Sequence, residues 1–184
     1  NSIMKKLLIL LFSLLMSFNS YGEGLKNLFG MTLFDQAEKY VSSSYIENNK
    51  FKHQETIEGF FTLIITDEIK TKSPFLTKYA IFLDNDNIIH EIYGSNELMN
   101  LEICKAVLES LSSELEEKYQ VKFEYEESPY ITFKIYSNYH NDSEGNYFSI
   151  QCRESYEETI SILQIYNSSF ILSDAIDEFY DAGL

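Results

Sequence analysis

The chain has 184 residues, a formal net charge of −15 at pH 7 and 45% hydrophobic residues, which is enough for a folded core in one domain or two small ones. The acidity argues against nucleic acids and anionic membrane surfaces as partners, because both are bound through clustered Lys and Arg. It is compatible with simple solubility or with attraction to a basic protein.

Residues 1–22 have the pattern of a secretory signal peptide. Lys5 and Lys6 precede an apolar run of about 12 residues, shorter than the roughly 18 to 20 that cross a bilayer. Small residues predict cleavage before Glu23, and Met4 is the expected start; an uncleaved anchor is the alternative. We therefore expect residues 23–184 to be exported to the periplasm or the extracellular space, without stable membrane insertion after cleavage.

The first half of this mature chain predicts one helix and three strands. The helix is expected to begin at Thr32, whose hydroxyl suits an N-cap, and to stop at the serines 42–44. Residues 46–55 are polar and indicate a loop, with or without an edge strand. Alternation and apolar content then predict strands over 57–66, 79–83 and 88–93. Turn-forming residues 84–87 make the last two a hairpin.

The clearest helix is expected over residues 96–120, between two strand-rich halves. Its apolar residues recur at three- and four-residue steps and form one face, which should cover a sheet. They are Leu101, Cys104, Leu108, Leu111, Leu115 and Tyr119.

The second half predicts four more strands and a short helix. The strands are expected over 121–126, 131–137, 147–152 and 159–166. Residues 127–129 should form a turn and 138–146 a loop. Ser173 is expected to cap the last helix and Gly183 to end it.

The only two cysteines, Cys104 and Cys152, are predicted to form a disulfide. Cys104 lies on the apolar face of its helix, and Cys152 shares a strand face with Phe148 and Ile150. A helix cysteine above a strand cysteine gives the geometry of a helix-to-sheet bridge, and export would favour its oxidation. A buried free thiol and a reactive thiol are the alternatives.

These elements predict an α+β fold in the order α-βββ-α-ββββ-α, with antiparallel sheet covered by helices. The organisation is a single domain over 23–184 or two fused halves, 23–95 and 96–184. The sequence Glu-Lys-Tyr recurs at the ends of the two long predicted helices, at 38–40 and 117–119, which motivates the tandem alternative.

No motif for cofactor or metal chemistry is present. The chain lacks a Gly-rich phosphate loop and the GxSxG, HExxH and CxxC patterns, so we expect no cofactor and no metal site. Protein-recognition loops combine tyrosine with small polar residues, and residues 137–147 have this composition. The candidate binding residues are Tyr136, Tyr139, His140 and Tyr147; the alternative is that these rings only cover the sheet edge.

The segment Phe29-Gly30-Met31-Thr32, followed by a short helix, resembles the opening of two exported protein families. These are the β-lactamase inhibitor protein family and the SmpA/OmlA (BamE) outer-membrane assembly lipoproteins. Both are helix-on-antiparallel-sheet folds that bind other proteins, and the inhibitor family is a tandem repeat of that unit. The second half of this chain has no copy of the motif, and the lipoprotein cysteine is missing.

The expected function is an exported, non-catalytic protein-binding domain, acting as an inhibitor, immunity or accessory factor on another protein of basic character. An envelope structural or assembly factor is the first alternative. The second is a hydrolase with an unrecognised carboxylate site, which would need buried, adjacent acids in a pocket.

Overall fold

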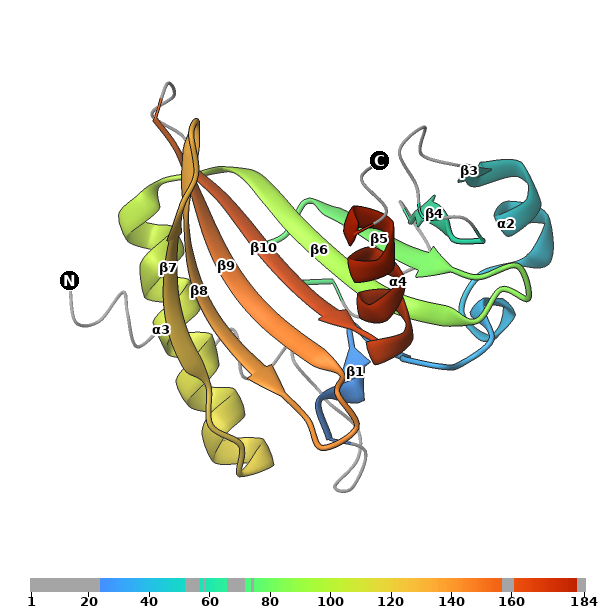
Figure 1. Ribbon diagram of the computed structural model, residues 1–184, viewed down its shortest axis with the longest axis horizontal. Helices are drawn as coiled ribbons and strands as arrows, with labels where there is room; N and C mark the ends of the chain where they lie inside the picture. Colours follow the sequence, from blue (N-terminus) through green and yellow to red (C-terminus); the bar gives the residue numbers. More distant parts are fainter. Residues whose placement is uncertain are drawn as a thin grey trace.

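The computed structural model describes residues 24–51, 57, 59–65, 72–73, 75–156 and 161–181; the predicted signal peptide lies outside them. It confirms the α+β class and roughly matches the predicted element order. Within the described residues, one antiparallel sheet has the strand order β3-β4-β5-β6-β10-β9-β8-β7 (Figure 1). Its strands are β3 (Lys50–Phe51), β4 (Phe61–Ile64), β5 (Lys78–Leu83), β6 (Ile89–Met99), β7 (Glu124–Pro129), β8 (Phe133–Asn141), β9 (Tyr147–Ser155) and β10 (Ser161–Ser168).

The remaining elements are short segments and three α-helices. They are η1 (Gly24–Lys26), β1 (Asn27–Leu28), β2 (Met31–Thr32), η2 (Ala37–Lys39), α2 (Ser43–Asn49), α3 (Leu101–Tyr119) and α4 (Phe170–Asp181). None of these described helices combines the length and the apolar character that a membrane crossing requires.

The large sheet consists of two four-stranded meanders. Strands β3 to β6 pair in chain order, and so do β7 to β10, each by antiparallel ladders. The last strands of the two meanders, β6 and β10, pair with each other, with Tyr93 opposite Tyr166. A helix precedes each meander, α2 before the first and α3 before the second.

Helix α3 covers one face of the second meander, as its apolar stripe predicted. Asn100 caps its start by accepting a hydrogen bond from the backbone N–H of Glu102, 2.9 Å away, and Gln120 ends it in the left-handed conformation. Its buried side chains contact β8, β9 and β10. The predicted bridge is present: Cys104 and Cys152 are both fully buried and joined by an S–S bond, with their Cα atoms 5.9 Å apart.

The segment that carries the family resemblance forms a tight turn. Phe29 and Gly30 both have positive φ, 54° and 79°, and link Leu28 to its strand partner Met31. The Phe29 ring then fits against Gly94, where an added Cβ would lie 2.8 Å from Cε2 of Phe29. Gly94 is therefore required by close packing, and the turn is held against the α3 side of the sheet.

The first predicted helix is wrong in its extent. Residues 37–39 form only one 3-10 turn, and the serines that were expected to stop a helix start one instead. Ser42 Oγ accepts from the backbone N–H of Tyr45 at 3.3 Å and caps α2, so residues 46–49, predicted as loop, are helical. Serine both disrupts helix interiors and caps helix starts, and only the first property entered the prediction.

The second half differs from the prediction by shifts along the chain. The turn between β7 and β8 lies at residues 130–132 rather than 127–129, closed by Tyr130 N donating to Phe133 O at 2.8 Å. Strand β8 continues to Asn141, into the predicted loop 138–146. Helix α4 begins at Phe170, before the predicted Ser173, and Gly183 lies outside the described residues.

Candidate functional site

The two faces of the large sheet are covered unequally. On the α3 side, the segment around η1 continues the cover, since the backbone carbonyl of Leu25 accepts a hydrogen bond from Asn167 and Phe29 packs on Gly94. On the other side, α4 contacts β6 and lies in front of the strands in Figure 1, whereas α3 lies behind them. On this face, the described residues of β8, β9 and β10 include several partly exposed side chains.

This open region carries a row of tyrosines and glutamines, here called the tyrosine face. Tyr93 is opposite Tyr166, and Gln164 is opposite Gln151, so strand alternation places all of them on the side away from α3. All of its side chains are partly exposed. Its members are Tyr93, Tyr139, Tyr147, Gln151, Gln164 and Tyr166.

Ring stacking orders one end of the tyrosine face. The rings of Tyr139 and Tyr147 stack with centroids 5.7 Å apart and an interplanar angle of 26°, and Tyr147 lies 5.7 Å from Tyr166. The hydroxyl of Tyr139 donates to a Glu124 carboxylate oxygen 2.9 Å away. The stacked rings of Tyr139 and Tyr147 turn their flat sides toward each other.

Amide side chains fix the other hydroxyls. Gln151 Nε2 donates to Tyr166 Oη at 2.7 Å, and Gln164 Nε2 donates to Tyr93 Oη at 2.8 Å. These contacts tie β9 to β10 and β10 to β6 at the level of the side chains. The positions of these tyrosine side chains are therefore fixed by contacts within the fold.

A carboxyl group with a strongly shifted pKa lies near this network. Burial raises the pKa of Glu91 to about 7, although a hydrogen bond from the Ser168 side chain opposes the shift. Burial, followed by the neighbouring Tyr147, also raises the pKa of Tyr166, so its hydroxyl stays protonated. Glu91 is thus a buried carboxyl whose pKa lies near 7, beside Tyr166 of the tyrosine face.

The structure separates the four binding residues that were predicted from sequence. Tyr139 and Tyr147 lie together on the tyrosine face. Tyr136 is on the opposite side, buried, with the Lys105 ammonium 3.4 Å from its ring centroid and its hydroxyl donating to Glu154. His140 is also on that side, with Nδ1 3.0 Å from the carbonyl of Lys122.

The sequence interpretation missed four members of the face. Tyr93, Gln151, Gln164 and Tyr166 lie in strands β6, β9 and β10, outside the predicted recognition segment 137–147. Polar and aromatic residues alternate with apolar ones along β9 and β10, and this period of two was the signal that could have found them.

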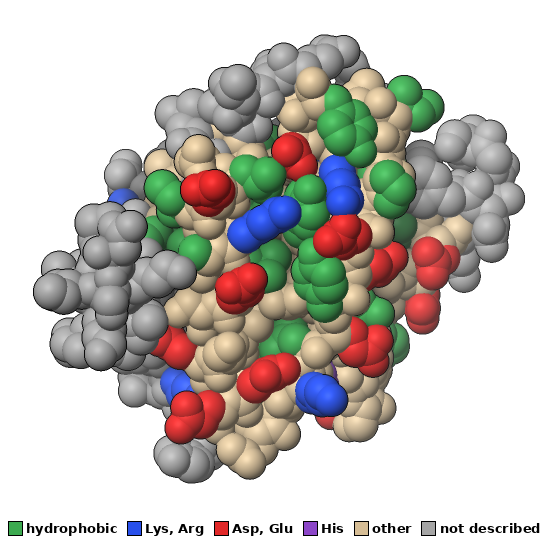
Figure 2. Space-filling model, turned by 90° about the vertical axis from the view of Figure 1, so that its left-hand side faces the viewer, with side chains coloured by type: hydrophobic (Ala, Val, Ile, Leu, Met, Phe, Trp, Pro, Cys, Tyr) green, Lys and Arg blue, Asp and Glu red, His purple; other side chains and the backbone are tan. Residues whose placement is uncertain are grey.

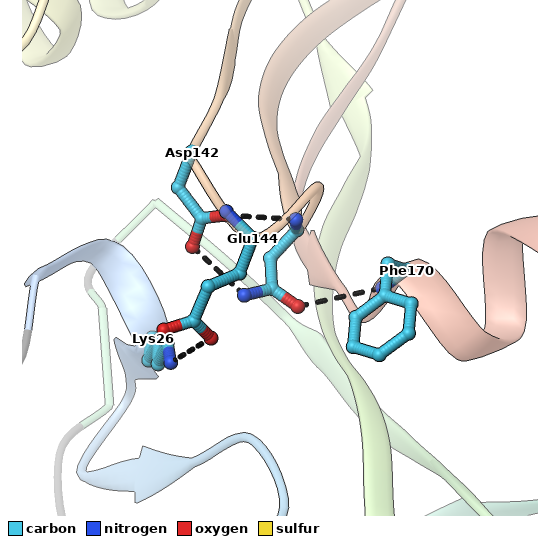
Figure 3. Close-up of polar contacts among 5 residues, drawn as sticks. Lys26, Asp142, Glu144 and Phe170 are labelled. Atoms are coloured by element: carbon cyan, nitrogen blue, oxygen red, sulfur yellow. Dashed lines mark hydrogen bonds and ion pairs between the residues drawn. The ribbon is translucent and has the colours of Figure 1, made fainter.

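The presumed recognition loop is a tightly held turn over residues 142–146 (Figure 3). Asp142 accepts from the backbone N–H of Glu144 and from the side-chain amide of Asn146, both at 2.8 Å. Asn146 Oδ1 accepts from the backbone N–H of Phe170 at 3.4 Å, and Lys26 Nζ lies 2.5 Å from Glu144. The turn therefore fastens β8 and β9 to η1 and to the start of α4.

A Ser–His–Asp arrangement elsewhere has a structural role. His90 Nδ1 lies 3.0 Å from Ser169 Oγ, and Nε2 lies 3.1 Å from Asp84 Oδ2. Ser169 is fully buried and its Oγ accepts from the backbone N–H of Leu172, capping α4. The Phe60 ring packs edge-on against the imidazole. A nucleophile needs an exposed approach, so this group ties α4 to β6 instead.

Comparison with protein-family models, curated protein sequences and solved structures found no significant match for the chain. Among the described residues, no group of three or more His, Cys, Asp or Glu side chains is placed to hold a metal ion. The tyrosine face is thus the candidate site that the fold itself offers.

Proposed function

We propose that this protein is an exported, non-catalytic protein-binding domain that contacts its partner through the tyrosine face. The observation that carries the proposal is the row of four partly exposed tyrosines from four adjacent strands, on the side of the sheet away from α3. Tyrosine contributes a large contact area at low entropic cost, and it is enriched in protein interfaces. Stacking and amide hydrogen bonds have already ordered these rings, which reduces the entropy lost on binding.

The charge of the chain favours a basic partner. The formal net charge is −15, and Glu124 lies directly beside Tyr139 at the edge of the face. Complementary charge speeds association and selects among partners more than it raises affinity. An acidic protein with an ordered tyrosine surface suits the role of an inhibitor, immunity or accessory factor for a basic protein.

Two features support export and the tandem organisation within this proposal. A fully buried disulfide fits an oxidising compartment, in line with the signal-peptide pattern of residues 1–22. Each meander of the sheet follows a helix, and the two meanders join at their last strands. This arrangement is what a duplicated helix-plus-sheet unit, as in the inhibitor family that the sequence resembles, would produce.

Site-specific photocrosslinking tests the proposed surface. A photoreactive phenylalanine at position 147 should give a discrete protein adduct in extracts of the producing cells, whereas the same group at the exposed α3 position 109 should not. With the crosslinked protein purified, Tyr139→Ala with Tyr147→Ala should weaken binding about tenfold or more. Ile103→Ala, at an exposed α3 residue, is the matched control and should leave affinity unchanged. Equal adducts from both positions, or full affinity of the tyrosine variant, would contradict the proposal.

A further inference from the structure

Strand β7 is an open edge of the large sheet. It pairs with β8 on one side, from Glu124 opposite Tyr139 to Pro129 opposite Lys134, and no strand of the described residues pairs with its other side. Every residue of β7 except Ser128 is exposed. Among the described residues, the strand at the opposite edge, β3, spans two residues. An edge strand presents free N–H and C=O groups that an added strand can pair with, so the six residues of β7 form a template for strand addition.

The acidic side chains on the two faces of β7 have different partners. On the α3 side, Glu127 forms an ion pair with Lys134 and accepts a hydrogen bond from Tyr125 at 2.6 Å. On the side of the tyrosine face, Glu124 and Glu126 accept hydrogen bonds from hydroxyl groups, those of Tyr139 and Ser128, each 2.9 Å away. Within the described residues, neither of these two acids has an ion pair. Figure 2 shows the side of the molecule on which α3 and β7 lie in Figure 1, where acidic, basic and hydrophobic side chains are interspersed.

These two carboxylates determine which strand can be added. A second copy of β7 would place acid near acid, and like charges across neighbouring strands are destabilising. An extended segment with Lys or Arg at alternate positions would instead set its cations beside Glu124 and Glu126 while its backbone pairs with β7. The same acids therefore prevent self-association through this edge and favour a basic strand.

We infer that the protein partner supplies an extended Lys- or Arg-bearing segment, which adds to β7 as a further strand and carries the rest of the partner over the tyrosine face. This inference rests on the proposed function, because it names the part of the partner that the proposed surface receives. It requires backbone pairing and charge together, and the two requirements can be tested separately.

Labelled synthetic peptides test the backbone requirement without changing the protein. The probe is a ten-residue peptide of alternating Lys and Val with blocked ends; the comparison peptides are its backbone N-methylated form and its Glu-for-Lys form. N-methylation removes the donors that a sheet ladder needs and keeps the charge. By fluorescence anisotropy at about 150 mM salt, the unmodified probe should bind, and each comparison peptide should bind about tenfold or more weakly. Equal binding of the N-methylated peptide would overturn strand addition.

Protein variants test the charge requirement. Glu124→Lys with Glu126→Lys should weaken probe binding about tenfold or more, whereas Glu109→Lys with Glu117→Lys, an equal charge change at exposed α3 acids, should not. Tyr139→Phe controls for the lost hydroxyl contact of Glu124. Equal weakening by both double variants would reduce the effect to net charge and overturn the inference. If the adduct from position 147 persists while the peptide tests fail, strand addition alone is wrong; loss of that adduct contradicts the proposed function itself.

Discussion

The side-chain amide of Gln164 donates a hydrogen bond to the hydroxyl of Tyr93, 2.8 Å away, at the boundary where the two meanders of the sheet meet. The same kind of contact recurs one strand further, where Gln151 donates to Tyr166 at 2.7 Å. Both bonds lie on the face away from α3. The two halves of the sheet are thus joined by side chains on their open face as well as by the backbone ladder.

Removal of either group of the Tyr93–Gln164 pair should destabilise the protein modestly, and the two effects should not add. In a double-mutant cycle of Tyr93→Phe and Gln164→Met, urea unfolding should give a coupling free energy of about 1 kcal/mol. Gln151→Met is the matched control, because Gln151 bonds to Tyr166 and should show no coupling with Tyr93→Phe. A coupling of zero for the first pair would mean that the hydrogen bond contributes nothing to folding.

The cap of α4 distinguishes the structure from the sequence-based prediction. Ser169→Ala should lower the free energy of unfolding by about 1 to 2 kcal/mol, because it removes the cap on Leu172 and leaves His90 Nδ1 without its partner. Ser173→Ala, at the residue predicted as the cap, should stay within about 0.5 kcal/mol of wild type. Urea unfolding followed by circular dichroism measures both. A larger loss of stability in Ser173→Ala than in Ser169→Ala would instead support a helix start at Ser173.

The fold could be predicted where apolar residues recur with a clear helical or strand periodicity. The apolar stripe of α3 and the inward direction of Cys152 were sufficient to predict the helix from Leu101 onward, the face it covers and the disulfide, whereas residues 96–99, predicted as helical, belong to β6. The predicted ends of strands and turns were wrong where the residues suit more than one local structure. Glu127 and Ser128 suit a turn by composition, yet they belong to β7 because their pairing with β8 outweighs local preference.

The candidate site was harder to predict because it depends on strand order. Tyr93 is far along the chain from Tyr147, and only the β6–β10–β9 arrangement brings both onto one face. Composition selected Tyr139 and Tyr147 together with Tyr136 and His140, and it could not show that the last two point to the other face of the sheet. A two-residue period within each strand predicts which residues share a face, but not which strands are neighbours.

The disulfide should contribute strongly to stability. Cys104 and Cys152 are 48 residues apart in the sequence, and closure of a loop of this length in the unfolded chain corresponds to about 4 kcal/mol in the chain-entropy description. The free energies of unfolding in urea with and without reductant should differ by about 4 kcal/mol. A variant with both Cys104→Ala and Cys152→Ala should show no effect of reductant. Equal stability of the wild-type protein under both conditions would show that no bridge forms in the purified protein.

The packing of the Phe29 turn predicts a sharp effect from a single added methyl group. At Gly94, a Cβ would lie 2.7 Å from Leu76 Cδ1 and 2.8 Å from Phe29 Cε2, closer than carbon atoms approach without displacement. Gly94→Ala should therefore destabilise the protein by about 1 to 3 kcal/mol. Phe29→Leu in the same background should recover part of the loss by vacating space, as thermal unfolding would show. An undisturbed melting temperature in Gly94→Ala would contradict the close packing of this turn on the sheet.

The carboxyl of Glu91 should make stability depend on pH in a direction opposite to that of most acids. Burial raises its pKa from 4.5 to about 7, so the folded protein holds this proton where the unfolded chain has lost it. The cost of ionising Glu91 in the fold is absent below about pH 4.5, grows as the pH rises toward about 7 and is complete above that value. Glu91→Gln should thus match wild type at low pH and exceed its stability by at most about 3 kcal/mol at about pH 8. Urea unfolding across this range measures the difference, with Glu109→Gln on the exposed side of α3 as the control. A difference that does not vary with pH would mean that Glu91 ionises in the fold as readily as in the unfolded chain.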